Sequence, residues 1–529
     1  YLTLVEKLKV VTAADVQRVA QAYFKEDQST TGWFIPQQEA PPAKVGAGGG
    51  FSAPKPLARG PHYYRDAESR SLLAGDGIGS EKGLSRAGPP LQQTPTQAGG
   101  GAGGGALIAP KVKRRTIAGV DVVTLKTSMK DVVTIRGVLA AGDVFNPAEN
   151  SAIADLAAGM IDKGTVQHDK FAVAEMLEQA GATLSFGTGT HTLNFSGKCL
   201  RKDLPLVLGL LAEQLRTPRF DADEFAKLKK QVVGRFKRQL EDTDFRAENA
   251  FQRVIYPAGH PNRPPAEDKY LADVESATLE QVKAFHAAHY GPASARIVAV
   301  GDVDDGAIDA RLQETFAQWR GGRAIPSAPK VPRLAAPRSE KVNMPGKTSV
   351  SFVVGQPSGL RYADPEYQAL NMATSVLGSG FFSARLLDII RNREGLTYGI
   401  GASLSADTYN DGAWTIEATF APDLLEKGRA SVLRELRRFH DEGLTPAELE
   451  TFKVTLTGSY KVALSTTGGL ASTLLNTLQR GYGPEWVDEF PRRLQALSLD
   501  QVNAAIKTYV DPAKMVTVTA GTHPDAPAK

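Results

Sequence analysis

Three distant stretches of the chain repeat one local pattern, a capped amphipathic helix followed by an apolar run. They are VTAADVQRVAQAYF (11–24), ATLEQVKAFHAAHY (277–290) and LSLDQVNAAIKTYV (497–510). Each begins with Thr or Ser at a helix N-cap position and has Asp or Gln three residues later, which is the spacing of a capping box. A Val then starts the apolar stripe, and a segment typical of a β-strand follows each helix. A chain that repeats the same ending in this way is expected to contain duplicated domains.

Three pairs of similar residues recur along the chain at nearly constant spacing. The pairs are Asn146 with Asp364, Glu224 with Glu448 and Thr278 with Ser498, at spacings of 218, 224 and 220 residues. We therefore expect two copies of a domain of about 200 residues. They cover 111–323 and 345–525, with a connector at 324–344, and residues 1–38 form the C-terminal tail of an earlier copy.

Residues 39–110 differ from the rest of the chain in composition. The Gly-rich runs VGAGGG and QAGGGAGGGA flank a Pro/Gly/Ser-rich interval with few branched apolar residues. Such a segment buries too little apolar surface to offset the entropy lost on ordering. We expect it to be a flexible, disordered linker.

Within each copy, strand patterns and long amphipathic helices are mixed without strict alternation. Strand patterns open both copies (DVVTIRGVLAAG and TSVSFVVGQ), and TYNDGAW predicts a hairpin turn between YGIGASLSA and GAWTIEATFAP. This order favours the α+β class, with an antiparallel-rich sheet packed by helices in each copy.

Charge and composition exclude several classes of partner. The net charge is only +4, with 62 basic and 58 acidic residues interspersed, which gives no basic surface for nucleic acid. A single cysteine, Cys199, excludes an internal disulfide and a cysteine-based zinc site. No apolar run approaches the roughly 18 residues that a membrane helix needs. We expect no nucleic-acid partner and no membrane span.

Together these features resemble the pitrilysin/insulinase family of zinc metallopeptidases, which includes the mitochondrial processing peptidases. The resemblance covers residues 1–38 and 111–525. It implies two halves, each of two homologous α+β domains, that close like a clamshell around a peptide. It also implies an extracytoplasmic, for example periplasmic, location, and an inverted zinc motif, His-x-x-Glu-His, on a helix shortly before a Lys-Gly-Thr-like loop.

The zinc motif is missing from this chain. Counting back from Lys163-Gly164-Thr165, the five motif positions hold Asp155, Leu156, Ala157, Ala158 and Gly159. Ala158 and Gly159 can neither bind a metal nor accept a proton, and Asp155 alone cannot hold a catalytic zinc. We expect Asp155 to be solvated. By resemblance, an upstream or partner half would bind the zinc, and this chain would bind none.

The eight histidines contain no alternative zinc motif. His286 and His289 lie three apart on one predicted helix, a spacing that permits metal binding. However, His289 aligns with Tyr23 and Tyr509 in the sister stretches, where large rings are used for packing. The sequence therefore favours a structural role for both histidines.

The second copy retains a more specific pattern, FFSARLLDIIRNREGLTYGIG (381–401). It places Arg391 seven residues before Tyr398, with Gly395 between them as a left-handed helix stop. By resemblance, this is the family's Arg-x6-Tyr pair. Tyr398 would donate a hydrogen bond to the oxyanion of the intermediate, and Arg391 would hold a substrate carbonyl or the same oxyanion. The alternative is that Arg391 caps the helix and Tyr398 is an ordinary strand residue.

Two neighbouring features are assigned no chemistry. Arg393 and Glu394 are expected to be exposed charges at the helix end. The Gly-Ser-Gly of VLGSGFFSARL (376–386) lacks the Lys-Ser/Thr of a phosphate-binding loop and follows a helix, so we expect only a tight turn.

Two functions follow from these observations. In the first, the chain is the zinc-free half of a metalloendopeptidase that encloses peptides or unfolded segments and donates Arg391 and Tyr398 to hydrolysis. The zinc-bearing half would be fused upstream or be a separate subunit. In the second, the chain is a non-catalytic scaffold or peptide-binding subunit of the same fold. In both cases we expect the chain alone to bind no stoichiometric zinc and to cleave no peptide.

Overall fold

The computed structural model describes residues 10–24, 107–378 and 383–523. The chain divides into two units, Tyr1–Tyr64 and Arg65–Lys529, which are treated separately. Most of the predicted linker and the strand predicted after the first helix lie outside the described residues.

The described part of the first unit is helix α2 (Ala13–Tyr23). The Thr12 hydroxyl accepts the Asp15 N–H (3.2 Å), and the Asp15 carboxylate accepts the Thr12 N–H (3.1 Å), so the predicted capping box forms. No residue of α2 is buried; Val16 is 61% exposed and Phe24 is 86% exposed. Within the first unit, no described residue covers the apolar stripe of this helix.

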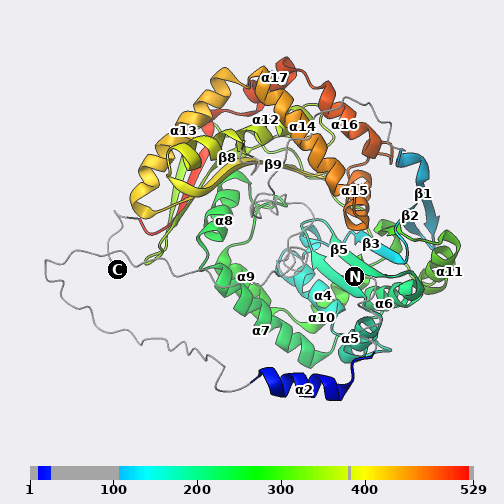
Figure 1. The fold of residues 1–529 in the computed structure, drawn as a ribbon. Coiled ribbons are helices and arrows are strands. Elements are labelled where there is room, and N and C mark those ends of the chain that lie inside the picture. Colours follow the sequence, from blue (N-terminus) through cyan, green and yellow to red (C-terminus); the bar gives the residue numbers. More distant parts are fainter. Residues whose placement is uncertain (1–9, 25–106, 379–382, 524–529) are drawn as a thin grey trace, which may run out of the picture. The chain divides into compact units, whose positions relative to one another are not determined.

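In the second unit, residues 107–323 form a first lobe around a six-stranded sheet of order β1-β2-β6-β3-β5-β4 (Figure 1). All neighbouring strands are antiparallel except β2 and β6. The strands are β1 (Val112–Ile117), β2 (Val120–Lys126), β3 (Val132–Leu139), β4 (Thr183–Thr188), β5 (Leu193–Leu200) and β6 (Arg296–Gly301). The helices are α4 (Ile153–Ile161), α5 (Lys170–Gln179), α6 (Leu204–Arg216), α7 (Ala222–Gln239), α8 (Thr243–Ile255), α9 (Glu267–Ser276), α10 (Leu279–His289) and α11 (Asp305–Phe316).

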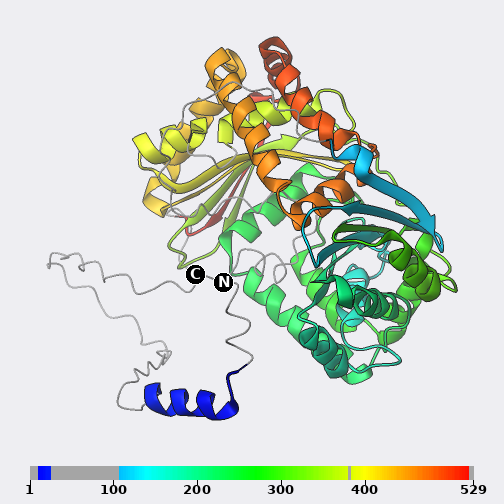
Figure 2. The same cartoon turned by 45° about the vertical axis from the view of Figure 1, so that its right-hand side comes forward.

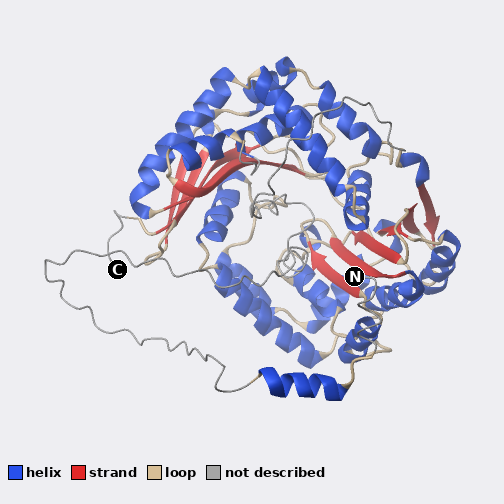
Figure 3. Ribbon diagram, in the orientation of Figure 1, coloured by secondary structure: helices blue, strands red, loops and turns tan. Residues whose placement is uncertain are grey.

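Residues 338–523 form a second lobe around a five-stranded sheet of order β7-β11-β8-β10-β9 (Figure 3). Only β7 and β11 are parallel. The strands are β7 (Arg338–Asn343), β8 (Val350–Pro357), β9 (Thr397–Ala406), β10 (Asp411–Phe420) and β11 (Val516–Gly521). The helices are α12 (Tyr367–Gly378), η7 (Leu387–Arg393), α13 (Leu425–Glu442), α14 (Pro446–Ala463), α15 (Thr467–Gln479), α16 (Trp486–Ala496) and α17 (Leu499–Tyr509).

The two sheets have the same strand order once β1 is set aside. Strands β2, β6, β3, β5 and β4 of the first lobe correspond in order and direction to β7, β11, β8, β10 and β9 of the second. The predicted hairpin is β9–β10, and the predicted N-caps Thr278 and Ser498 both form capping boxes. The predicted α+β class, with an antiparallel-rich sheet packed by helices in each lobe, is confirmed.

Each sheet buries one face against helices of its own lobe. In the first lobe, Ile135 and Phe195 of the sheet share a core with α4, α6 and α10. In the second lobe, Phe352 and Trp414 share a core with α12, α13 and α17. The repeated capped helix of each lobe packs on the first helix of that lobe, α10 on α4 and α17 on α12.

The opposite faces of the sheets are covered by helices exchanged between the lobes (Figure 2). Helix α8 of the first lobe packs on β8 and β11, where Phe251 and Ile255 are buried. Helix α15 of the second lobe packs on β3 and β6, where Leu474 and Leu475 are buried. Because each lobe completes the core of the other, apolar burial joins them into one packed body.

None of the helices in the described ranges is long and apolar enough to cross a membrane.

Candidate functional site

Helix α4 carries the five positions that align with the family's zinc motif. Ala157 is fully buried and Ala158 is 5% exposed. A Cβ added at Gly159 would lie 2.9 Å from Leu228 Cδ2, so a leucine of α7 fills the space into which a longer side chain would extend. A ligand at Gly159 would require Leu228 to move.

Asp155 is 33% exposed, so it is partly solvated as expected, but it also has protein partners. It accepts a hydrogen bond from the Tyr270 hydroxyl (3.1 Å) and lies 3.5 Å from the Arg235 guanidinium. Burial, together with the charge of Asp155, raises the pKa of Tyr270, which keeps this phenol a protonated donor. These partners come from α7 and α9 and lie 80 and 115 residues after Asp155 in the sequence, so no local pattern reveals them.

The described residues contain no group of three or more His, Cys, Asp or Glu side chains that could hold a metal ion. The residues at the motif positions therefore do not fit a catalytic zinc. His286 Nε2 lies 2.9 Å from the Leu215 carbonyl oxygen, and the buried His289 ring packs between Phe145 and Phe285. Burial lowers the pKa of both histidines, as expected for neutral rings used in packing.

The second lobe brings Arg391 and Tyr398 together. The guanidinium carbon of Arg391 lies 4.4 Å from the centroid of the Tyr398 ring, which is a cation–π contact. Tyr398 is 84% exposed and Arg391 is half-buried. Both predicted side chains thus reach the surface at one place, near one end of β9.

Arg391 is carried by a helix that is wider than an α-helix. In η7, a π-helix, the Glu394 N–H donates to the Ile389 carbonyl and the Leu396 N–H donates to the Ile390 carbonyl, both at 3.0 Å. Gly395, at φ +64°, ends the helix in the predicted left-handed conformation. Short π-helical turns are frequent at functional sites because the extra residue redirects a side chain.

Tyr398 lies in a β-bulge. The pairing of β9 with β10 shifts between Ile400 and Thr397. The Thr397 hydroxyl holds the irregular turn by donating to the Thr419 carbonyl (2.5 Å) and accepting the Gly399 N–H (3.2 Å). In a regular strand Tyr398 would share the buried face of Ile400, but here it is exposed. Bulges redirect side chains in this way, often beside active sites.

The first lobe lacks this donor pair. Helix α5 is also followed by a left-handed glycine, Gly181 at φ +57°, and then by an edge strand, β4. Counted from that glycine, Leu177 and Leu184 stand where Arg391 and Tyr398 stand in the second lobe. Leucine cannot donate a hydrogen bond, so the donors are confined to one lobe.

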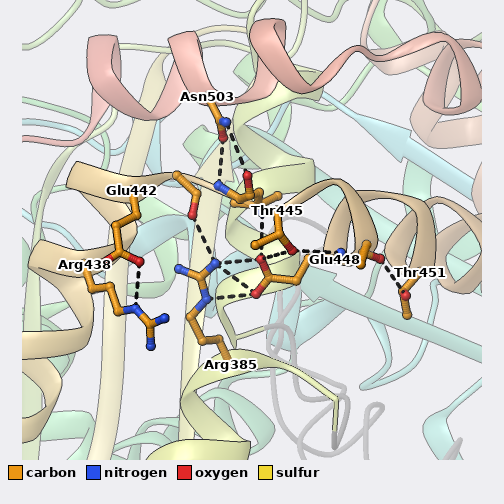
Figure 4. A network of polar contacts seen from close by, with 10 residues as sticks. Arg385, Arg438, Glu442, Thr445, Glu448, Thr451 and Asn503 are labelled. Atoms are coloured by element: carbon orange, nitrogen blue, oxygen red, sulfur yellow. Dashed lines mark hydrogen bonds and ion pairs between the residues drawn. The ribbon is translucent and has the colours of Figure 1, made fainter.

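A buried ion pair fixes the start of η7 (Figure 4). The Arg385 guanidinium donates to both carboxylate oxygens of Glu448 (2.8 and 2.9 Å) and to the Gly443 carbonyl (3.0 Å), and its side chain is 10% exposed. Burial alone would raise the pKa of Glu448, but hydrogen bonds from Arg385 and Thr445 outweigh it and hold that pKa below its usual value. In the sequence analysis Glu448 served only as a marker of the repeat, and its ion pair with Arg385 was not predicted.

A second contact fixes the other end of η7. Glu394, which we expected to be exposed, accepts hydrogen bonds from the Ser431 hydroxyl (2.5 Å) and the Arg434 guanidinium (2.6 Å) of α13. Arg393 is 72% exposed and pairs with Asp388, as expected of a helix-end charge. The segment that carries Arg391 is therefore anchored at both ends, and only Glu394 required a correction.

Gly378 brings the end of α12 close to β9. A Cβ at this position would lie 2.5 Å from the Ala402 nitrogen, so only glycine fits. The remainder of the Gly-Ser-Gly turn lies outside the described residues.

Comparisons with protein families cover both lobes. Residues 121–258 match the model described as insulinase (peptidase family M16), and residues 276–456 match the model described as peptidase M16 inactive domain.

Curated relatives are similar over most of their own length. The chain is 23% identical over 379 residues to the non-peptidase homolog YmxG of Helicobacter pylori, covering 70% of this chain and 84% of that protein. It is 22% identical over 353 residues to an uncharacterized zinc protease of Streptomyces coelicolor, covering 66% and 76%.

Solved structures share the fold. A peptidase M16 inactive domain from Pseudomonas fluorescens superposes with a TM-score of 0.72 at 25% identity, covering 78% of this chain and 98% of that one. The periplasmic protease PqqL of Escherichia coli superposes with a TM-score of 0.62 at 16% identity, covering 83% of this chain and 49% of that one. The chain belongs to the insulinase (M16) peptidase family and carries its inactive-type domain.

Proposed function

We propose that this chain is the zinc-free half of an M16 metalloendopeptidase. In this role it forms part of the wall around a bound peptide and donates Arg391 and Tyr398 to peptide-bond hydrolysis. A homologous half, fused upstream or separate, binds the zinc. Since α4 offers no ligand set, the metal and the hydrolytic water belong to that half.

The observation that carries this proposal is the stacked pair of donors. The Arg391 guanidinium carbon lies 4.4 Å from the centroid of the Tyr398 ring on an anchored segment, and these two donor groups are suited to stabilise negative charge on a peptide carbonyl oxygen. The first lobe has leucines at the equivalent positions, so packing of this fold does not require the pair. A π-helix and a β-bulge, both local irregularities, bring the two side chains to the surface.

The substrate class that we propose is a peptide or unfolded segment. Strand β9 is an edge of its sheet and begins beside Tyr398, so an extended peptide could pair with its free side and pass the donors. We place the enzyme in the periplasm or another extracytoplasmic space, because the structurally similar PqqL is described as a periplasmic protease.

We also propose that both lobes are copies of one domain and that residues 1–38 are the tail of a third. In the two lobes, Val282 and Val502 of the repeated helix are fully buried against the rest of their lobe. The equivalent residue of α2, Val16, is 61% exposed. Two other apolar residues of α2, Val19 and Tyr23, are also exposed. The face that is left open on α2 is thus the face that its sister helices bury. A preceding homologous domain would cover it.

A second candidate function is a non-catalytic scaffold or peptide-binding subunit. The similarity to a relative named a non-peptidase homolog favours it. In this case the Arg391–Tyr398 stack would contribute only to local packing.

Peptide-cleavage kinetics of the native protein that contains this chain, assayed with its zinc-bearing half, separate the two candidates. We would purify it through an affinity tag and assay it with quenched fluorescent peptides. Replacing Tyr398→Phe removes one donor to the oxyanion and should lower kcat by about 100-fold, with little change in KM. Tyr409→Phe is the matched control, because the Tyr409 ring packs on His191 and lies outside the proposed site.

Unchanged kcat in Tyr398→Phe would remove this residue from the mechanism. Absence of cleavage over a broad peptide set, even with the zinc-bearing half present, would favour the scaffold.

A further inference from the structure

Within the part of the chain that the structure describes, no strand pairs with the outer edge of β7. The order of the five-stranded sheet places β7 at one end, opposite β9, and its partner is β11 in parallel pairing. Strand β7 spans six residues, Arg338–Asn343, and all but Val342 are exposed. A row of unsatisfied main-chain groups at such an edge is a template for another strand.

The hydrogen bonds identify which groups point outward. The Arg338 N–H donates to the Met515 carbonyl (3.2 Å), and the Met344 N–H donates to the Gly521 carbonyl (2.8 Å). Because direction alternates along a strand, Glu340 also faces β11, whereas the N–H and C=O groups of Ser339 and Lys341 point away from the sheet. Within the described residues, no hydrogen bond to these outward groups is formed.

The sister sheet shows what normally occupies this edge. There β1 pairs with the outer edge of β2, which corresponds to β7. The connector that precedes β7 cannot form an equivalent strand, because it contains four prolines, which lack an N–H. They are Pro326, Pro329, Pro332 and Pro337.

A groove of about 650 Å³ lies alongside this edge, between the end of α8, residues 331–334 and β7. Its apolar wall includes Tyr256 and Leu334. Three arginines line it, with Glu340 as the one acidic residue: Arg253, Arg263 and Arg338. Arg263 donates to the Tyr256 carbonyl (2.5 Å), whereas Arg253 and Arg338 form no ion pair with any described residue.

We propose that the β7 edge binds an extended acidic polypeptide segment as an added strand. Its main chain pairs with Ser339 and Lys341, and alternate side chains enter the groove, where carboxylates meet Arg253 and Arg338. Lysine on an edge disfavours pairing between identical strands, so Lys341 argues against a second copy of this chain. The site is independent of Arg391 and Tyr398, which lie at the opposite edge of the sheet.

The test uses the whole chain and two fluorescent seven-residue peptides, one alternating Val and Glu and the other alternating Val and Lys. By fluorescence anisotropy at low ionic strength, the Glu peptide should bind at least about tenfold more tightly. Ser339→Pro removes an outward N–H without touching the bonds to β11 and should weaken binding about tenfold. Ser339→Ala keeps the main-chain donor and should bind normally.

A charge-reversed variant keeps the test decisive if Ser339→Pro folds poorly. Arg253→Glu with Arg338→Glu should reverse the preference, so that the Lys peptide binds more tightly than the Glu peptide. Equal binding of both peptides, or a preference that the charge reversal leaves unchanged, would overturn the proposal. Self-association of the chain that Ser339→Pro abolishes, measured by sedimentation, would also overturn it in favour of a second copy.

Discussion

At the scale of single residues, the exposed Tyr398 and the half-buried Arg391 form a pair of defined geometry. An exposed cation–π contact contributes only about 0.5–1 kcal/mol to folding. A gain in stability of this size is a weak explanation for the Arg391–Tyr398 contact. The need to orient two hydrogen-bond donors explains the contact better. The sequence predicted both residues, because their spacing around Gly395 lies within one continuous segment.

Replacing Arg391→Ala removes a half-buried side chain together with its cation–π contact and should lower the free energy of unfolding by about 1–2 kcal/mol. Urea denaturation followed by circular dichroism measures this. A loss of several kcal/mol would indicate that Arg391 is mainly a structural residue of η7.

Glu448 gives a pH dependence with a defined sign. Its pKa in the folded state lies below the ordinary value of 4.5, so its ion pair with Arg385 stabilises the chain at higher pH. This stabilisation is lost as the pH falls from about 4.5 through the lower folded-state pKa. Glu448→Gln should therefore be less stable than the unmodified chain at pH 7, with a difference that shrinks below pH 4.5.

Thermal unfolding from pH 7 to pH 3 measures this difference. Glu442→Gln is the matched control, because Glu442 forms an exposed pair with Arg438 that contributes little. A constant difference between the Glu448→Gln and unmodified chains across the range would contradict the assignment.

At the scale of elements, sequence patterns predicted which helices and strands exist better than they predicted local irregularities within them. The capped helices and the β9–β10 hairpin depend on contacts between neighbouring residues, so their signals are local. The π-helical form of η7 and the bulge in β9 were not predicted. Both depend on anchors that are distant in the sequence, such as Glu448, Ser431 and Thr419, which no local pattern reveals.

Two glycines in the second lobe should respond oppositely to substitution. Gly395 has φ +64°, so Gly395→Ala places a side chain in the left-handed region and should destabilise the chain by about 1 kcal/mol. Gly458 lies exposed inside α14 with no atom within 4 Å of an added Cβ, so Gly458→Ala should stabilise it by about 0.5–1 kcal/mol. Denaturant titrations compare the two, and equal effects would contradict the conformational argument.

At the scale of the whole molecule, the lobes are joined by the exchange of α8 and α15. Regular spacing of repeat markers predicted equivalent domains; the two lobes have equal strand orders, and their origin as copies of one domain stays a proposal. It did not predict the exchange, because amphipathic helices carry no signal for which sheet they cover. For the same reason, the partners of Asp155 were not foreseen.

The exchange predicts that the lobes unfold together. Phe251 of α8 is 2% exposed and packs on the sheet of the second lobe, so Phe251→Ala should cost about 3–5 kcal/mol. Hydrogen exchange followed by mass spectrometry should show reduced protection in both sheets. Loss of protection confined to the first lobe would indicate that the lobes fold independently.

The central claim is that this chain is a zinc-free contributor to a metallopeptidase. The most direct test is the zinc content of the purified chain, measured by inductively coupled plasma mass spectrometry together with a peptide-cleavage assay. The account predicts far less than one zinc ion per chain and no cleavage by the chain alone. One zinc ion per chain, with cleavage by the isolated chain, would contradict it.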